Sequence, residues 1–195
     1  GKPAMAREVR PSMSGDWKAF AAGWKERRAR AEAAGISRFT SPSRLEEKER
    51  PRLETGEVPR PSRAAEIGVL CHKIMEELEF SDPSVPAGTE VEALEIMRGF
   101  FKSDAFRELA GSEILARELP FLMPHGHQIL QGVIDVVYRR EGRVIVADYK
   151  TDREIHPEGY RMARDLYVRA VEQTLGLKVA AFKLMFLRQG VIVDV

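Results

Sequence analysis

Gly132-Val-Ile-Asp135 and, shortly after it, Asp148-Tyr-Lys150 are the stretches that decide the fold of this chain. Each lies in a segment rich in Ile, Leu and Val, and the polar residues between the two segments end in Glu141-Gly142. This pattern predicts two antiparallel strands joined by a tight turn. If the turn is centred on Glu141-Gly142, Asp135 and Asp148 are equally distant from it and face each other.

The predicted pairing brings two carboxylates together inside an apolar sheet. Opposed side chains have Cβ atoms about 4.5–5.5 Å apart, so two ionised carboxylates repel each other, and apolar neighbours make their desolvation costly. A hard divalent cation such as Mg²⁺ relieves both effects because it prefers oxygen ligands. Lys150 lies on the same strand face as Asp148, from which its ammonium group can reach a phosphate or a water molecule. The alternative is a hairpin with a surface Asp–Lys pair, which edge strands often carry.

Composition restricts the class of protein. A chain of 195 residues with 44% hydrophobic residues can form one domain with a substantial core. The apolar runs are too short for a membrane span and no secretory signal is visible, so we expect a cytoplasmic protein with no membrane partner. Cys71 is the only cysteine, which excludes an intramolecular disulfide and a four-cysteine iron–sulfur cluster within this chain.

The net charge of +1 does not indicate a polycation, although basic residues cluster over 25–30 and 48–63. Such clusters either follow a nucleic-acid backbone or form a solvated helix face and linker.

Elsewhere, apolar periodicity and turn residues predict helices before and after a group of three strands. We expect helices over 15–34, from Arg44, and over 63–80, 90–102, 104–109 and 159–175, and further strands over 114–123, 178–187 and 191–195. This order is typical of an α+β or mixed α/β sandwich around a central sheet.

Two groups of histidines are candidate metal ligands. His72 lies at the border of the apolar stripe of the helix over 63–80, where a histidine is either structural or a ligand. Gly68 precedes it by one turn, and a glycine in a helix interior indicates that another backbone segment approaches closely. His125 and His127 flank a glycine, which favours an exposed hairpin tip over a metal site.

Taken together, these residues resemble the PD-(D/E)xK nuclease superfamily and, within it, the RecB-like domains at the C-terminal end of UvrD-type helicase–nucleases such as RecB and AddA. Five segments carry the resemblance, in order, over about residues 38–187: Phe39-Thr-Ser-Pro-Ser-Arg-Leu-Glu46, Gly68-Val-Leu-Cys-His72, Arg117-Glu-Leu-Pro-Phe121, Gly132-Val-Ile-Asp135 and Asp148-Tyr-Lys-Thr-Asp152. The implied fold is α/β (α+β) and restriction-endonuclease-like, with a central mixed β-sheet flanked by helices and an N-terminal helical extension.

The resemblance also implies a division of the chain. We expect residues 1–13 to be a tag or disordered lead and 14–195 to form a single nuclease domain. Within that domain, 14–60 would be the helical extension and linker, and 61–195 the catalytic core.

The resemblance implies a role for each matched residue. The catalytic residues would be Asp135, Asp148 and Lys150, with Lys150 orienting or activating the water and stabilising the charge that develops on the phosphate. The ligands of Mg²⁺ or Mn²⁺ would be His72, Asp135, Asp148 and the main-chain carbonyl of Tyr149. Glu118, Tyr149 and Tyr167 would support the site.

One position departs from the RecB-like pattern. The helix after the lysine usually carries Gln-x-x-x-Tyr, and this chain has Tyr167 but Ala163 in place of the glutamine. Tyr160 and Arg164 are the nearby residues that can substitute for it.

The implied activity is metal-dependent hydrolysis of DNA phosphodiester bonds, with exonuclease action favoured, in a helicase–nuclease of double-strand break repair and recombination. The implied partners are single-stranded or unwound duplex DNA, the helicase domain of the same parent chain, and a partner subunit. No iron–sulfur cluster is expected. Two alternatives stay open: a nuclease-like domain that only binds DNA or a partner, for which Ala163 is the sole support, and a stand-alone RecB-like nuclease.

Overall fold

The computed structural model describes residues 39–40, 62–125 and 128–195. The expected helices over 15–34 and from Arg44 lie outside the described residues, as do the expected lead over 1–13 and nearly all of the extension and linker.

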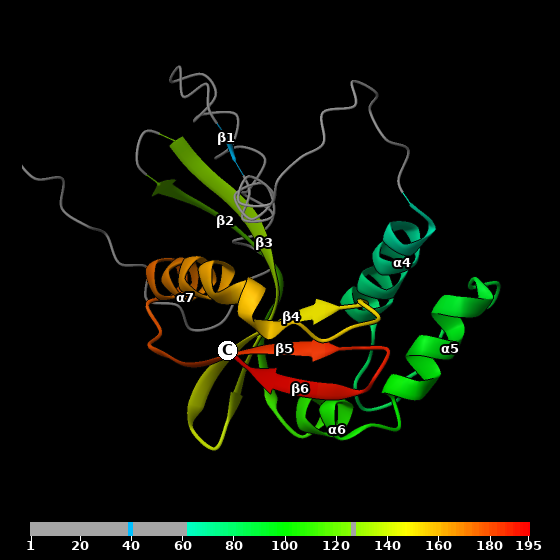
Figure 1. Ribbon diagram of the computed structural model, residues 1–195. Coiled ribbons are helices and arrows are strands. Elements are labelled where there is room, and N and C mark those ends of the chain that lie inside the picture. The colour runs from blue at the N-terminus through cyan, green and yellow to red at the C-terminus, as the bar shows by residue number, and fades with distance from the viewer. Residues whose placement is uncertain (1–38, 41–61, 126–127) are drawn as a thin grey trace, which may run out of the picture.

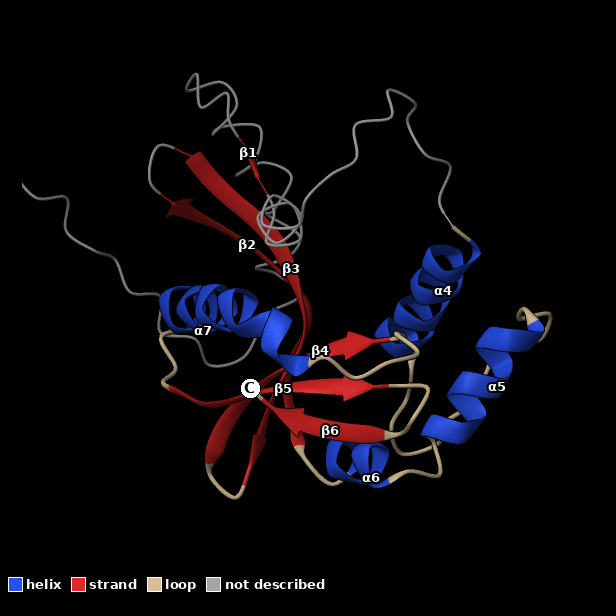
Figure 2. Cartoon of the chain, viewed as in Figure 1, coloured by secondary structure: helices blue, strands red, loops and turns tan. Residues whose placement is uncertain are grey.

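After the short strand β1, which was not predicted, the described elements follow the predicted order of helices, three strands, a helix and two strands (Figure 2). The helices are α4 (Arg63–Glu77), α5 (Val91–Phe100), α6 (Asp104–Ala110) and α7 (Arg161–Leu175), with a 3-10 turn η1 (Pro157–Tyr160) before α7. The strands are β1 (Phe39–Thr40), β2 (Glu113–His125), β3 (Gln128–Arg140), β4 (Arg143–Lys150), β5 (Val179–Phe186) and β6 (Val191–Asp194). None of the described helices is long and apolar enough to cross a membrane.

The strands form one mixed sheet, which confirms the predicted fold class. The order β1-β3-β4-β5-β6 runs through the sheet, and β2 pairs with β3. The β1–β3 and β4–β5 pairs are parallel, whereas the β2–β3, β3–β4 and β5–β6 pairs are antiparallel. The long strand β3 therefore pairs with β2 on one edge and with β1 and then β4 on the other.

Helices cover the two faces of the sheet and create two cores (Figure 1). On one face, α4, α5 and α6 pack against β4 side chains such as Ile145, Ala147 and Tyr149. On the other, α7 and the β2–β3 hairpin pack against Val144 and Val146. Since side chains alternate along a strand, Asp148 and Lys150 point toward the α7 side.

The β3–β4 hairpin has the predicted register. Glu141 and Gly142 have φ values of 52° and 75°, which is the positive φ at both central residues that a type I′ turn requires. Arg140 lies opposite Arg143, and the pairing continues to Val136 opposite Ala147.

Beyond that pair the two strands separate, and β4 continues along β5 alone as far as Lys150 opposite Phe186. Asp135 and Asp148 are the next residues on either strand. They therefore stand at the two sides of a fork rather than in a continuous ladder.

Helix α4 is fixed at both ends. The Ser62 hydroxyl accepts a hydrogen bond from the Ala65 amide and so caps the N-terminus of the helix. At the other end, Arg117 of β2 donates to the carbonyl of Leu78 at 2.5 Å, and its guanidinium lies 4.1 Å from the centre of the Phe80 ring. The helix stops at Glu77, three residues before its predicted end.

Gly68 faces the loop that follows β4. A Cβ atom at this position would lie 3.1 Å from the Thr151 hydroxyl oxygen. The close neighbour of Gly68 is thus a side chain and not the backbone segment that was predicted. The contact places α4 beside the end of the strand that carries Lys150.

Candidate active site

Asp135 lies on β3 at the point where β3 and β4 separate. Its carboxylate is buried, at 8% exposure. One oxygen, Oδ2, accepts a hydrogen bond of 2.6 Å from the Tyr149 amide, which no longer has a partner on β3. The Asp135 side chain thus satisfies a buried donor that the separation of the strands would otherwise leave unpaired.

His72 reaches the same carboxylate from α4. Its Nδ1 lies 3.5 Å from the second oxygen of Asp135, Oδ1, and its Nε2 lies 3.1 Å from the Tyr149 carbonyl oxygen. Burial lowers the pKa of the imidazole, but the hydrogen bond to Asp135 and the nearby negative charges outweigh it and raise the pKa to about 9. The imidazole is held between two oxygen atoms in a strongly negative environment.

Glu118 completes the cluster from β2. Arg117 lies opposite Val136 and Leu119 opposite Ile134, so Glu118 stands opposite Asp135 in the same register. Its backbone has φ of 45°, a conformation that costs a glutamate about 1–3 kcal/mol and persists where the surrounding structure enforces it. Burial, followed by the Asp135 charge, raises the pKa of Glu118 to about 7.

One ligand atom each from His72, Glu118 and Asp135 lie within 4.8 Å of one another. An imidazole nitrogen and two carboxylate oxygens suit a divalent cation such as Mg²⁺ or Mn²⁺, and the nitrogen favours Mn²⁺. The pKa of Glu118 is raised by burial and then by the Asp135 charge, and a bound cation would oppose both effects by favouring the ionised carboxylate. The three side chains therefore fit a divalent metal site, with Glu118 present in the cluster and the expected ligand Asp148 outside it.

Asp148 and Lys150 form a separate pair on the α7 side of the fork. Lys150 Nζ lies 2.5 Å from Asp148 Oδ2, and both side chains are largely buried. Burial raises the pKa of Asp148 even though the Lys150 charge opposes the change. For Lys150, burial lowers the pKa, and the adjacent Asp148 carboxylate outweighs it and raises the pKa above its usual range. The ammonium group is thus charged and close to the cluster.

Tyr160 lies over this pair. Lys150 Nζ is 4.5 Å from the centre of the Tyr160 ring, and the Tyr160 hydroxyl donates to Asp152 at 3.2 Å. Tyr160 is the last residue of η1, immediately before α7.

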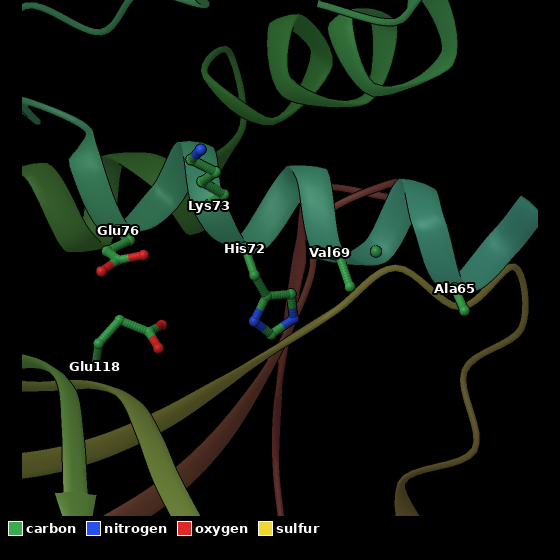
Figure 3. A pocket seen from close by; sticks show the side chains of 7 residues that line it. Ala65, Val69, His72, Lys73, Glu76 and Glu118 are labelled. Atoms are coloured by element: carbon green, nitrogen blue, oxygen red, sulfur yellow. The ribbon is translucent and has the colours of Figure 1, made fainter. Parts of the chain in front are cut away.

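A pocket of about 580 Å³ opens beside the cluster along α4 (Figure 3). It is lined by Ala65, Gly68, Val69, His72, Lys73, Glu76 and Glu118. In Figure 3, His72 projects from the helix toward the strands, and the carboxylates of Glu76 and Glu118 point toward one another. The candidate metal cluster is therefore open to solvent on the α4 side.

The structure brings the predicted site residues into two neighbouring groups, and the charges of Asp135 and His72 in the first group also shift the pKa of Asp148 in the second. His72, Asp135 and the Tyr149 main chain lie together, whereas Asp148 pairs with Lys150 and is not in the three-residue cluster. Glu118, predicted to be a supporting residue, is a member of that cluster.

The predicted residues in and just before α7 lie in different surroundings. The Tyr167 ring packs 5.9 Å from the rings of both Phe121 and Phe182, in the core on the α7 side. Ala163 is buried, and Arg164 pairs with Asp165. Of the two residues considered as substitutes for the missing glutamine, Tyr160 is the one in contact with Lys150.

Sequence reasoning missed the central position of Glu118, although a signal for it exists. Counting from a turn centred on Gly126-His127 places Glu118 opposite Asp135, as counting from Glu141-Gly142 does for Asp148. The predicted tip histidines, His125 and His127, have side chains outside the described residues.

Three curated proteins similar to this chain are each named as one subunit of an ATP-dependent helicase/nuclease. The protein from Staphylococcus carnosus (strain TM300) is 31% identical over 121 residues, which cover 46% of this chain and 10% of that protein. The one from Desulforudis audaxviator (strain MP104C) is 32% identical over 137 residues, 60% of this chain and 11% of that protein. A third, from Staphylococcus haemolyticus (strain JCSC1435), is 23% identical over 210 residues, 84% of this chain and 16% of that protein. The chain thus spans about a tenth to a sixth of the length of these relatives.

The family model of the PD-(D/E)XK nuclease superfamily matches residues 77–189, more than half of the chain. The matched range contains Glu118, Asp135, Asp148 and Lys150, while His72 lies just before it. The mixed sheet and the matching range agree, and the chain belongs to the PD-(D/E)XK nuclease superfamily.

Proposed function

We propose that this chain is the DNA-cleaving domain of a helicase–nuclease and hydrolyses phosphodiester bonds with Mg²⁺ or Mn²⁺, acting as an exonuclease in double-strand break repair and recombination. The observation that carries the proposal is the convergence of His72, Glu118 and Asp135 next to the charged pair of Asp148 and Lys150. The names of the relatives support the association of a nuclease with a helicase.

The residues of this chain divide the work of hydrolysis. His72, Glu118 and Asp135 would hold the divalent cation, with the Tyr149 carbonyl beside them and Asp148 available from the opposite side of the fork. Once bound, the cation would polarise a phosphate oxygen and make an attacking water more acidic. Lys150 would place positive charge where negative charge develops on the phosphate during the attack.

Positive charge on Lys150 depends on Asp148. The Asp148 carboxylate, 2.5 Å from Nζ, keeps Lys150 protonated and holds its ammonium group in position. Lys150 would therefore act as an electrostatic stabiliser and water-orienting donor rather than as a general base.

Digestion of end-labelled DNA tests the activity and its type. The purified chain should degrade linear single-stranded DNA in Mg²⁺ or Mn²⁺, leave circular DNA intact, and lose activity in EDTA. Replacing Asp148 with Ala should abolish cleavage while leaving the far-ultraviolet circular dichroism spectrum unchanged. Undiminished digestion by the Asp148→Ala variant would overturn the assignment, and cleavage of circles would replace exonuclease by endonuclease action.

Metal binding distinguishes a nuclease from the alternative, a domain that only binds DNA. Calorimetric titration with Mn²⁺ should give one saturable site in the wild-type chain, because three ligand atoms already converge. DNA binding without any Mn²⁺ binding would favour the alternative.

A further inference from the structure

We propose that Tyr160 is a positioning residue that holds the Lys150 ammonium group in place through the face of its ring. The inference rests on the proposed function and adds to it a residue outside the acidic cluster. It assigns a role to the turn before α7, from which the ring reaches the end of β4.

The contact is a cation–π interaction. Lys150 Nζ lies 4.5 Å from the centre of the Tyr160 ring, within the range of about 6 Å over which such attraction acts. The ammonium group also contacts Asp148 Oδ2 at 2.5 Å. The lysine is thus held by both a carboxylate and a ring face, and the ring attracts the charge without accepting a proton.

The ring is itself fixed at two points. Tyr160 ends η1 and directly precedes α7, so its backbone belongs to the junction of two helical segments. Its hydroxyl donates to Asp152 Oδ2 at 3.2 Å. Asp152 lies in the loop that follows β4, and the side chain of Gln189 donates to the Asp152 carbonyl at 3.1 Å. The position of the ring is therefore tied to the strand that carries Lys150.

Lysine has four rotatable side-chain bonds, and one carboxylate leaves much of that freedom in place. Asp148 and Lys150 are two residues apart on one strand, so their pair alone does not decide how far Nζ leans toward the fork. The ring of Tyr160 supplies a second point of contact and restricts the ammonium group further. We therefore expect loss of the ring to lower the rate of the chemical step and to have little effect on binding of DNA or metal.

Two variants separate the ring from the hydroxyl. Tyr160→Phe keeps the ring and loses the hydrogen bond to Asp152, whereas Tyr160→Leu loses the ring face. On single-stranded DNA with Mn²⁺, Tyr160→Leu should lower kcat by about fivefold to tenfold with KM unchanged. Tyr160→Phe should retain a kcat within about twofold of wild type, because the ring face remains.

Three results would overturn the inference. An unchanged kcat in Tyr160→Leu would remove the role altogether. A loss of DNA affinity in Ca²⁺ with kcat preserved would make Tyr160 a DNA contact, and an equal loss in Tyr160→Phe would assign the effect to the hydroxyl. If the wild-type chain cleaves no DNA, the proposed function fails, and the contact is then tested by stability alone.

That stability test is a double-mutant cycle in urea with Lys150→Met, Tyr160→Leu and the double variant. If the ring holds the ammonium group, the two losses of stability are not additive, since each single change already removes the contact. Additive losses would show that the two side chains are independent and would overturn the inference whether or not the chain is active.

Discussion

Buried carboxylates lie on both the α4 side and the α7 side of the fork between β3 and β4, but different groups neutralise them. On the α4 side, the Glu118 and Asp135 carboxylates meet one imidazole, and the pKa values of Glu118 and His72 are both raised. On the α7 side, the Asp148 carboxylate already has a cation, Lys150, at 2.5 Å. The first side has excess negative charge that a divalent ion would balance, and the second is close to balanced within the protein.

This difference indicates a separation of tasks within one site. The α4 side is suited to binding a metal, whereas the α7 side is suited to stabilising charge during the reaction. The Tyr149 main chain connects the two, since its amide donates to Asp135 and its carbonyl lies beside His72, while its neighbours in sequence are Asp148 and Lys150. Changes on the two sides should therefore have distinguishable effects on metal affinity and on rate.

The largest effect is expected from Asp135→Asn. The substitution removes a charge from the metal cluster and turns one acceptor of Asp135 into a donor, next to the Tyr149 amide. We expect cleavage to fall by about three orders of magnitude and Mn²⁺ binding, measured by calorimetry, to be lost. Glu154→Gln, an exposed acid on a loop paired with His156, is the control and should keep both. Normal Mn²⁺ affinity in Asp135→Asn would mean that the cluster is not the metal site.

Lys150→Met tests the other side. The variant keeps most of the length of the side chain and removes its charge, so kcat should fall by about a hundredfold while Mn²⁺ affinity stays within about threefold of wild type. Single-turnover cleavage and calorimetry measure the two quantities, with the exposed Lys178→Met as the matched control. Loss of Mn²⁺ affinity in Lys150→Met would show that the two sides are not separate.

The pH dependence of stability should reveal the unbalanced charge of the α4 side. The folded pKa of His72, about 9, is above its value of 6.5 in an unfolded chain, so its contribution is complete below pH 6.5 and is lost as the pH rises through 9. The folded pKa of Glu118, about 7, is above 4.5, so the folded state is disfavoured as the pH rises from 4.5 to 7. The raised pKa values of His72 and Glu118 both predict that the metal-free protein becomes less stable from about pH 5 to about pH 9.

A bound divalent cation should reverse this trend, because it takes the place of the protons. The rise in Tm on adding Mn²⁺ in place of EDTA should be larger at about pH 8.5 than at about pH 6, and should correspond to about 2.7 kcal/mol when the free cation is about a hundredfold above its Kd. Differential scanning fluorimetry at the two pH values measures it. An equal rise at both would argue against His72 and Glu118 as ligands.

The smallest effect is expected at the support of the α4 side. Arg117→Met removes the hydrogen bond to the Leu78 carbonyl and the contact with the Phe80 ring, and should lower the free energy of unfolding by about 1–2 kcal/mol. Arg107→Met, which removes an exposed pair with Asp104 on α6, should change it by less than about 1 kcal/mol. Urea denaturation compares the two, and equal losses would show that Arg117 does not anchor α4.

The sequence predicted the parts of this site that depend on local pattern. The Glu141-Gly142 turn and the apolar alternation on either side of it suffice to place Asp135 and Asp148 at matching positions. The apolar periodicity likewise predicted that α4 begins at Arg63. These features follow from neighbouring residues and from a period of two or 3.6.

The separation of the strands beyond Val136 and Ala147 was not predictable in the same way. It depends on how β4 follows β5 and on the bond between the Asp135 carboxylate and the Tyr149 amide. The contact between Tyr160 and Lys150 depends on the packing of α7 against the sheet. These are tertiary arrangements that no local pattern encodes.

The Glu141-Gly142 turn is far along the hairpin from Asp135 and Asp148, yet it determines which residues of β3 and β4 lie opposite each other at the site. It sets how many residues separate the two aspartates, and a strand shifted by one residue turns every side chain to the opposite face. A slip of β4 by one residue against β3 would therefore direct Asp148 and Lys150 toward α4 and Tyr149 toward α7. A turn that is distant from both aspartates along the hairpin thus helps to decide which side chains of β4 reach the candidate active site.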